Sequence, residues 1–115
     1  MLLLTLLMLL GGGSHFDKTV HDFGKIRLKD GPRSCTFTLI NNGTEDVNIL
    51  AVTTSCGCTS VKWTREAIKP GCRGKVDATF SNDEGPYPFD KTIAVYLSDS
   101  SKPVILHMKG TATKK

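Results

Sequence analysis

Two cysteines separated by a single glycine stand out in the stretch TTSCGCTS at residues 53–60. Two further cysteines, Cys35 and Cys72, bring the total to four in a chain of 115 residues. Neighbouring thiols can form a disulfide, exchange electrons with another thiol, or hold a soft metal ion such as Cu(I) or Zn(II). Which of these is open to Cys56 and Cys58 depends on the elements that hold them.

The short spacing of Cys56 and Cys58 indicates that a disulfide between them would stabilise the fold poorly. In an extended chain, residues two apart point to the same face, and their α-carbons lie roughly 6.6–6.8 Å apart, at the outer limit for a disulfide. Gly57 could shorten this distance by turning, because it has no Cβ and accepts a positive φ. A bond between the two would still close a small, strained ring, and strain makes a disulfide easier to reduce.

Residues 1–14 are predicted to be an export signal. The almost wholly apolar run MLLLTLLMLL precedes four small residues, GGGS, as in secretory signals. Because a membrane-spanning helix needs about 20 apolar residues, we expect no membrane span in the mature chain. We therefore expect an exported protein, periplasmic or extracellular, with residues 15–115 as a single domain. Disulfides persist in such an oxidising compartment.

Charge and composition argue against nucleic acid as a partner. The formal net charge of +4 is modest and spread along the chain. A nucleic-acid-binding surface usually shows a basic stripe interleaved with stacking aromatic residues, and this sequence has no such stripe. The charges are therefore interpreted as a solvated surface.

Alternating apolar and polar residues recur along the chain, and the helical period does not, which indicates an all-β fold. In CTFTLINN, for example, Cys35, Phe37 and Leu39 share one face, as in a sheet packed on one side. Turn-rich stretches separate such segments at short intervals, which is typical of an antiparallel β-sandwich of about seven strands. Breaks in the alternation predict β-bulges at Gly24 and near Leu50. The predicted core consists of Phe37, Leu39, Val76, Phe80, Ile93, Val95, Val104 and Leu106.

Several stretches together resemble the secreted bacterial family known only as domain of unknown function 1573. They are HDFGKI, TTSCGCTS followed by Trp63, IKPGCRGKVDATF and FDKTIAVYL, and the similarity spans about residues 17–112. The resemblance implies an immunoglobulin-like sandwich related to PapD-like and sperm-protein-like modules, in exported proteins of uncharacterised function. Cys35 and Cys72 depart from the usual pattern of the family, so their roles rest on this sequence alone.

Counting strands assigns each cysteine to one end of such a sandwich, because successive strands run between two poles. The strand that begins at Cys35 starts at one pole. The following strand ends at that same pole, so Cys56 and Cys58, which come directly after it, should lie there too. If a short edge strand comes next, the strand after it begins at the far pole with Cys72. A disulfide needs α-carbons within about 7 Å. We therefore predict that Cys56 or Cys58 bonds to Cys35, and that Cys72 is free and partly accessible.

Three loops should converge at the pole of Cys35, namely KDGPRS, the CGC stretch and NDEGPYPF. They would gather aromatic and cationic side chains that suit partner binding. The candidate contact residues are Arg33, Cys56, Gly57, Cys58, Lys62, Trp63, Tyr87 and Phe89. An alternative is that Tyr87 and Phe89 only cap the end of the core.

We favour an exported, non-catalytic binding or scaffold module, with a protein or a glycan as its partner. The chain has no nucleophile and base at a recognisable spacing, no paired carboxylates and no phosphate-binding loop, so we expect neither an enzyme nor a cofactor. The alternative is a thiol-redox or soft-metal-handling role for Cys56 and Cys58. A closed zinc site needs four ligands, and only Cys35 is expected near this pair.

Overall fold

The computed structural model describes residues 13–115 of the chain. This part contains one short 3-10 turn, η1 (Leu28–Asp30), and no helix that is long and apolar enough to cross a membrane. The predicted export signal lies outside the described residues, except for its last two positions. The strands of the described chain are β1 (Ser14–Phe16), β2 (Val20–Arg27), β3 (Arg33–Asn41), β4 (Ile49–Thr54), β5 (Thr59–Trp63), β6 (Arg73–Phe80), β7 (Pro88–Leu97) and β8 (Val104–Thr113).

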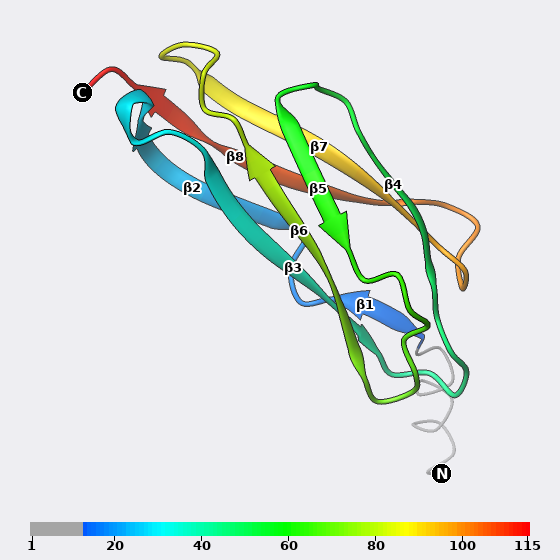
Figure 1. The fold of residues 1–115 in the computed structure, drawn as a ribbon. Coiled ribbons are helices and arrows are strands. Elements are labelled where there is room, and N and C mark those ends of the chain that lie inside the picture. Colours follow the sequence, from blue (N-terminus) through cyan, green and yellow to red (C-terminus); the bar gives the residue numbers. More distant parts are fainter. Residues whose placement is uncertain (1–12) are drawn as a thin grey trace, which may run out of the picture.

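The strands form two four-stranded sheets, in the orders β1-β3-β6-β5 and β2-β8-β7-β4 (Figure 1). All neighbouring strands run antiparallel except β2 and β8, which are parallel. The predicted β-sandwich is confirmed, with eight strands where about seven were expected. The additional strand arises near the N-terminus, where the chain pairs first with β3 and then crosses to the other sheet as β2.

The core lies between the inward faces of the two sheets, where alternate residues of each strand meet. Seven of the eight predicted core residues are buried, and six of them, all but Phe80, have an exposed fraction of 0%. Val104 is only partly buried, because it is the first residue of β8 and lies beside the exposed turn at residues 98–103. The alternation of the sequence therefore identified which face of each strand turns inward.

Both predicted bulges are present. The pairing of β2 with β8 shifts register between Asp22 and Lys25, and Gly24 has a φ of 71° at this point. The pairing of β4 with β7 shifts between Ile49 and Ala51. The second bulge leaves Leu50 on the surface and brings the rest of β4 into phase for its approach to the CGC turn.

Replacing either of two buried aromatic residues should test this core directly. Phe37→Ala or Phe80→Ala should each lower the free energy of unfolding by about 3 to 5 kcal/mol, because each change empties a well-packed aromatic site. Urea denaturation followed by circular dichroism measures the effect. Val104→Ala should cost clearly less, and a loss below about 1 kcal/mol for both phenylalanine variants would contradict the observed packing.

Candidate functional site

Three loops meet at one end of the sandwich, which we call the CGC pole. They are residues 28–32 between β2 and β3, residues 55–58 between β4 and β5, and residues 81–87 between β6 and β7 (Figure 1). Strand register places them level with one another, because Arg33 of β3 and Thr59 of β5 both pair with Phe80.

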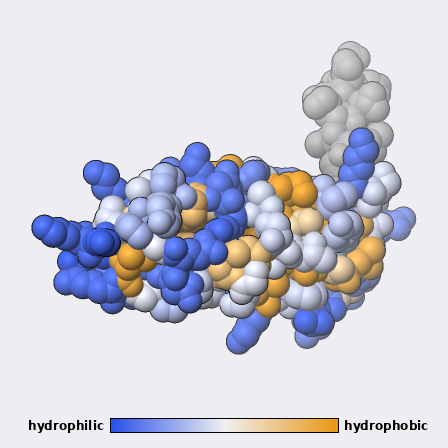
Figure 2. Space-filling model, turned by 90° about the horizontal axis from the view of Figure 1, so that it is seen from above, coloured by the Kyte–Doolittle hydropathy of each residue, from blue (hydrophilic) through white to orange (hydrophobic). Residues whose placement is uncertain are grey.

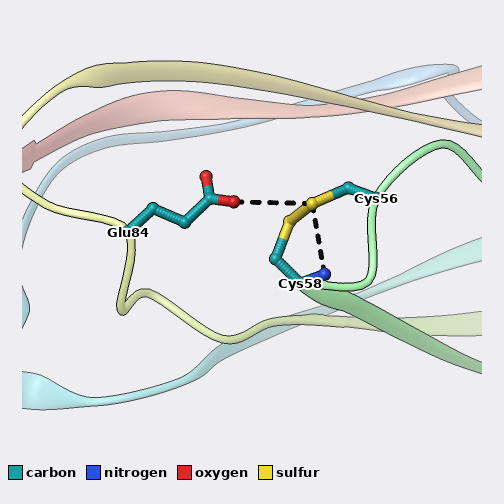
Figure 3. A group of neighbouring side chains, drawn as sticks. All are labelled: Cys56, Cys58 and Glu84. Carbon is teal, nitrogen blue, oxygen red and sulfur yellow. Dashed lines mark hydrogen bonds between the residues drawn. A yellow bond between two sulfur atoms is a disulfide. The ribbon is translucent and has the colours of Figure 1, made fainter.

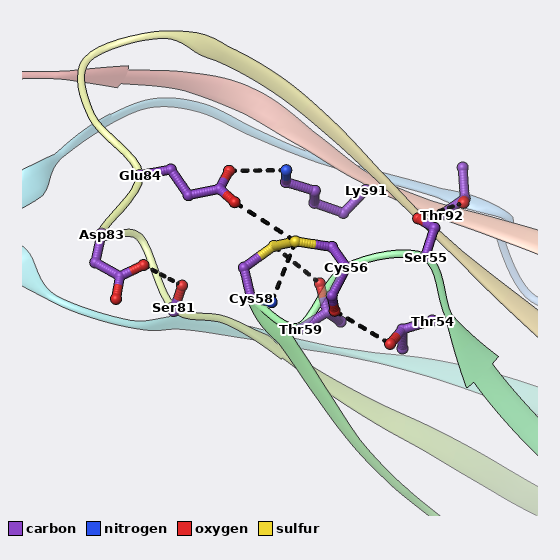
Figure 4. The surroundings of a disulfide bond; sticks show 10 residues. All are labelled: Thr54, Ser55, Cys56, Cys58, Thr59, Ser81, Asp83, Glu84, Lys91 and Thr92. Atoms are coloured by element: carbon purple, nitrogen blue, oxygen red, sulfur yellow. Dashed lines mark hydrogen bonds and ion pairs between the residues drawn. A yellow bond between two sulfur atoms is a disulfide. The ribbon is translucent and has the colours of Figure 1, made fainter.

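Cys56 and Cys58 are bonded to each other within a tight turn (Figure 4). The Thr59 N–H donates to the Cys56 carbonyl at 3.2 Å, and this turn brings the two cysteine α-carbons to 5.1 Å. The prediction of a bond to Cys35 is therefore wrong, because it assumed an extended backbone at these residues. Gly57 is not among the glycines with positive φ, so the turn forms without the conformation expected of it.

The other two cysteines are free and lie in contrasting surroundings. Cys35 faces the core, and burial raises the pKa of its thiol to about 11. Cys72 is exposed and lies beyond the other end of β3, where its carbonyl accepts the N–H of Asn41 at 3.0 Å. The prediction that Cys72 is free, accessible and remote from the CGC pair is confirmed.

An acidic side chain that the sequence did not single out lies against the disulfide (Figure 3). Glu84 Oε2 is 3.5 Å from Cys56 Sγ, and its other oxygen pairs with Lys91 Nζ at 2.8 Å. Lys91 has 19% of its side chain exposed and lies over the ring of Phe80, so it holds the carboxylate from the protein side. The backbone N–H of Cys58 donates to Cys56 Sγ at 3.1 Å.

The two sulfur atoms and the Glu84 carboxylate lie within 4.8 Å of one another. A soft metal ion would need the cysteines as thiolates. In the disulfide state only the carboxylate is available as an anionic ligand. Cys35, which the sequence offered as a third sulfur ligand, is not part of this group.

Asn82 joins two of the three loops. Its side-chain Nδ2 donates to the carbonyls of Arg27 at 2.9 Å and Gly31 at 2.8 Å, and its backbone has a φ of 57°. The residue is buried, and the neighbouring Ser81 N–H donates to the carbonyl of Cys58 at 2.9 Å. The loop at residues 81–87 is thus bonded both to the loop at residues 28–32 and to the CGC turn.

A basic cleft of about 540 Å³ opens at the same end of the molecule. Its only acidic side chain, Asp30, is already paired with Arg27 at 3.2 Å. The cleft is lined by Lys25, Ile26, Arg27, Asp30, Arg33, Thr113 and Lys115. The tip of the molecule away from the grey atoms is correspondingly hydrophilic in Figure 2. Unpaired cations around a cleft favour an anionic group on a ligand.

Of the two aromatic residues predicted to contact a partner from the loop at residues 81–87 and the start of β7, only Tyr87 is exposed. Tyr87 is 62% exposed at the pole. Phe89 instead stacks on Phe80 with ring centroids 4.2 Å apart and closes the end of the core.

The two candidates on β5 lie farther along that strand. Trp63 packs partly against the core beneath Arg65 and pairs with Val76, well along the sheet from the pole. Lys62 is exposed on the outer face of the same sheet.

The sequence pattern of the family described as "Protein of unknown function (DUF1573)" matches residues 14–112. The chain belongs to this family. No curated protein matches the chain in sequence.

Solved structures agree with the fold of this DUF1573 domain. A protein of unknown function from Porphyromonas gingivalis W83 has a TM-score of 0.70 at 20% identity, over 89% of this chain and 46% of that protein. The chain therefore spans about half of that relative. PapD-like domain 7 of human CEP192 has a TM-score of 0.71 at 12% identity, over 90% and 87% of the two chains. The Caenorhabditis elegans MSP family member WR4 has 0.59 at 12%, over 89% and 99%.

Replacing Asn82 should show how far it holds the pole together. Asn82→Ala should lower the free energy of unfolding by about 2 to 4 kcal/mol, because the carbonyls of Arg27 and Gly31 lose the donor that the buried amide supplies. Asn82→Gly removes the same hydrogen bonds but accepts the positive φ, so it should be more stable than Asn82→Ala by about 1 kcal/mol. Chemical denaturation measures both. Equal stabilities for the two variants would contradict a contribution from the backbone conformation.

The two free thiols should differ strongly in reactivity. With a chromogenic disulfide reagent at pH 8, Cys72 should react at once in the native protein, and Cys35 should react only as the protein unfolds, because it is buried as the neutral thiol. Alkylation followed by peptide mapping assigns each thiol. Rapid reaction of Cys35 in the native state would contradict its burial.

The raised pKa of Cys35 also has a consequence for stability. The folded state binds the thiol proton more tightly than the unfolded state does, so this contribution is complete below pH 9 and is lost as the pH rises through about 11. Over that interval the wild type should lose stability relative to Cys35→Val, and parallel curves for the two proteins would contradict this expectation.

Proposed function

We propose that this DUF1573 domain is an exported, non-catalytic binding module that contacts its partner through the CGC pole. The partner is a protein or a glycan that presents an anionic group to the basic cleft. Export is supported by the disulfide, since such bonds persist in oxidising compartments.

The observation that carries this proposal is the combination of a rigid loop platform with unpaired surface cations. Hydrogen bonds from Asn82 and Ser81 fix the three loops to one another. A preorganised surface loses little conformational entropy on binding. Loops held on a rigid sandwich commonly carry binding residues.

Arg33 and Tyr87 are the side chains best suited to hold a partner at this pole. Arg33 lines the basic cleft, and a guanidinium can bind a carboxylate, phosphate or sulfate with two parallel hydrogen bonds. Tyr87 is exposed, and its ring lies against Gly85, where a Cβ would come within 2.7 Å of it. Arginine and tyrosine are enriched among residues that dominate binding energy.

A pair of double variants tests this surface. The pole variant carries Arg33→Ala and Tyr87→Ala, and the control carries Leu50→Ala and Lys102→Ala, which remove an exposed apolar residue and an exposed cation at the opposite end. Wild type and both variants are immobilised and exposed to the exported protein fraction and to a panel of acidic glycans. Ligands of the wild type should bind the control equally and the pole variant at least about ten-fold more weakly.

Raising the salt concentration should weaken the same complexes, because the cleft attracts its ligand by charge. Melting temperatures of both variants should stay close to that of the wild type. Ligands that bind the pole variant as tightly as the control would exclude the CGC pole as the binding surface.

A further inference from the structure

The bond between Cys56 and Cys58 adds little to the stability of the fold. It closes a loop that contains one intervening residue, and a disulfide that closes so short a loop removes little entropy from the unfolded chain. Both cysteines belong to the same turn, so the bond joins no two strands. The role of this disulfide is therefore more readily explained by its redox chemistry than by any stabilisation of the fold.

The contact with Glu84 distinguishes the two oxidation states of the pair. A carboxylate oxygen lies 3.5 Å from Cys56 Sγ, but a disulfide sulfur carries no proton to donate. A thiol at Cys56 would donate to that oxygen, and hydrogen bonds to charged groups are the stronger ones. Since Lys91 holds the carboxylate in place, Glu84 favours the reduced state over the disulfide.

We propose that Cys56 and Cys58 form a reversible thiol–disulfide site that accepts two electrons from a dithiol, and that Glu84 tunes its equilibrium toward the reduced form. Both sulfur residues are partly exposed, as this chemistry requires. The turn is also open at Gly57, where an added Cβ would meet nothing within 4 Å. This inference does not depend on the proposed partner binding at the pole.

A partner that carries two thiols supplies both electrons for this exchange. One partner thiolate attacks Cys58 Sγ, the bond between Cys56 and Cys58 breaks, and its electron pair leaves on Cys56 Sγ. Attack at Cys58 makes Cys56 the leaving sulfur, and Cys56 Sγ is the sulfur that already accepts the Cys58 N–H. The leaving thiolate accepts the hydrogen bond from the Cys58 N–H and takes a proton from water. As a thiol, Cys56 then donates a hydrogen bond to the Glu84 carboxylate.

The partner's second thiolate then attacks the partner's first sulfur, which is bonded to Cys58 in the mixed disulfide. Cys58 is released as a thiolate, which also takes a proton. The partner is oxidised to a disulfide, and the CGC pair is reduced to a dithiol. With glutathione, two molecules supply the two thiols in the same sequence.

Equilibration with glutathione redox buffers tests the site in the folded protein. All proteins carry Cys72→Ser so that the exposed thiol forms no mixed disulfides. After equilibration at a series of ratios of reduced to oxidised glutathione, acid quenching, alkylation and mass spectrometry give the fraction of reduced pair. Circular dichroism of the same samples reports whether the chain stays folded. We expect complete, reversible reduction without unfolding.

Two variants from one loop identify the contribution of Glu84. Glu84→Ala removes the acceptor beside Cys56, so its equilibrium should shift about five-fold toward the disulfide. Asp83→Ala removes an equal charge from a residue that bonds Ser81 instead, and its equilibrium should change less than about two-fold. Equal shifts in the two variants would overturn the role of Glu84. Reduction that occurs only when the chain unfolds would overturn the exchange site itself, whatever the binding experiment shows.

Discussion

The CGC pole depends on one side-chain amide, that of Asn82. Its two donated hydrogen bonds satisfy the carbonyls of Arg27 and Gly31, on either side of the turn between β2 and β3. The backbone that presents this amide has a φ of 57°, a left-handed conformation that asparagine tolerates better than most residues. The loop at residues 81–87, which contains Asn82, also carries Glu84 to the disulfide and leads to Tyr87. The basic cleft and the environment of the sulfur atoms therefore rest on one local backbone conformation.

The core supports the pole through the residues where the strands end. Phe80 is the last residue of β6, and its backbone pairs with the first residues of both β3 and β5. Its ring stacks on Phe89 and lies beneath Lys91, so burial of one aromatic group also fixes the cation that pairs with Glu84. Hydrophobic packing and site electrostatics are thus coupled at this point. A change in the packing of Phe80 should move the carboxylate as well as weaken the core.

The sequence predicted the parts of this structure that depend on periodicity. Alternation identified the buried faces, breaks in it located the bulges at Gly24 and Leu50, and strand counting separated Cys72 from the CGC pair. The disulfide partner was predicted wrongly because alternation says nothing about a turn. Glu84 and Asn82 were missed for a related reason. Each acts across a long sequence separation from an irregular loop, where spacing carries no information about which side chains meet.

The backbone of Cys58 explains how the pair could change oxidation state without disturbing the pole. Its carbonyl accepts the N–H of Ser81, and the Thr59 N–H closes the turn onto the carbonyl of Cys56. Neither bond involves a sulfur atom, so both persist when the bond between the sulfurs breaks. Reduction would then create two thiols, and the Cys56 thiol would lie opposite an acceptor that is already held in place by Lys91. Because the acceptor is preorganised, little entropy is lost in forming the new hydrogen bond, and the contact with Glu84 shifts the balance between the two states toward the dithiol.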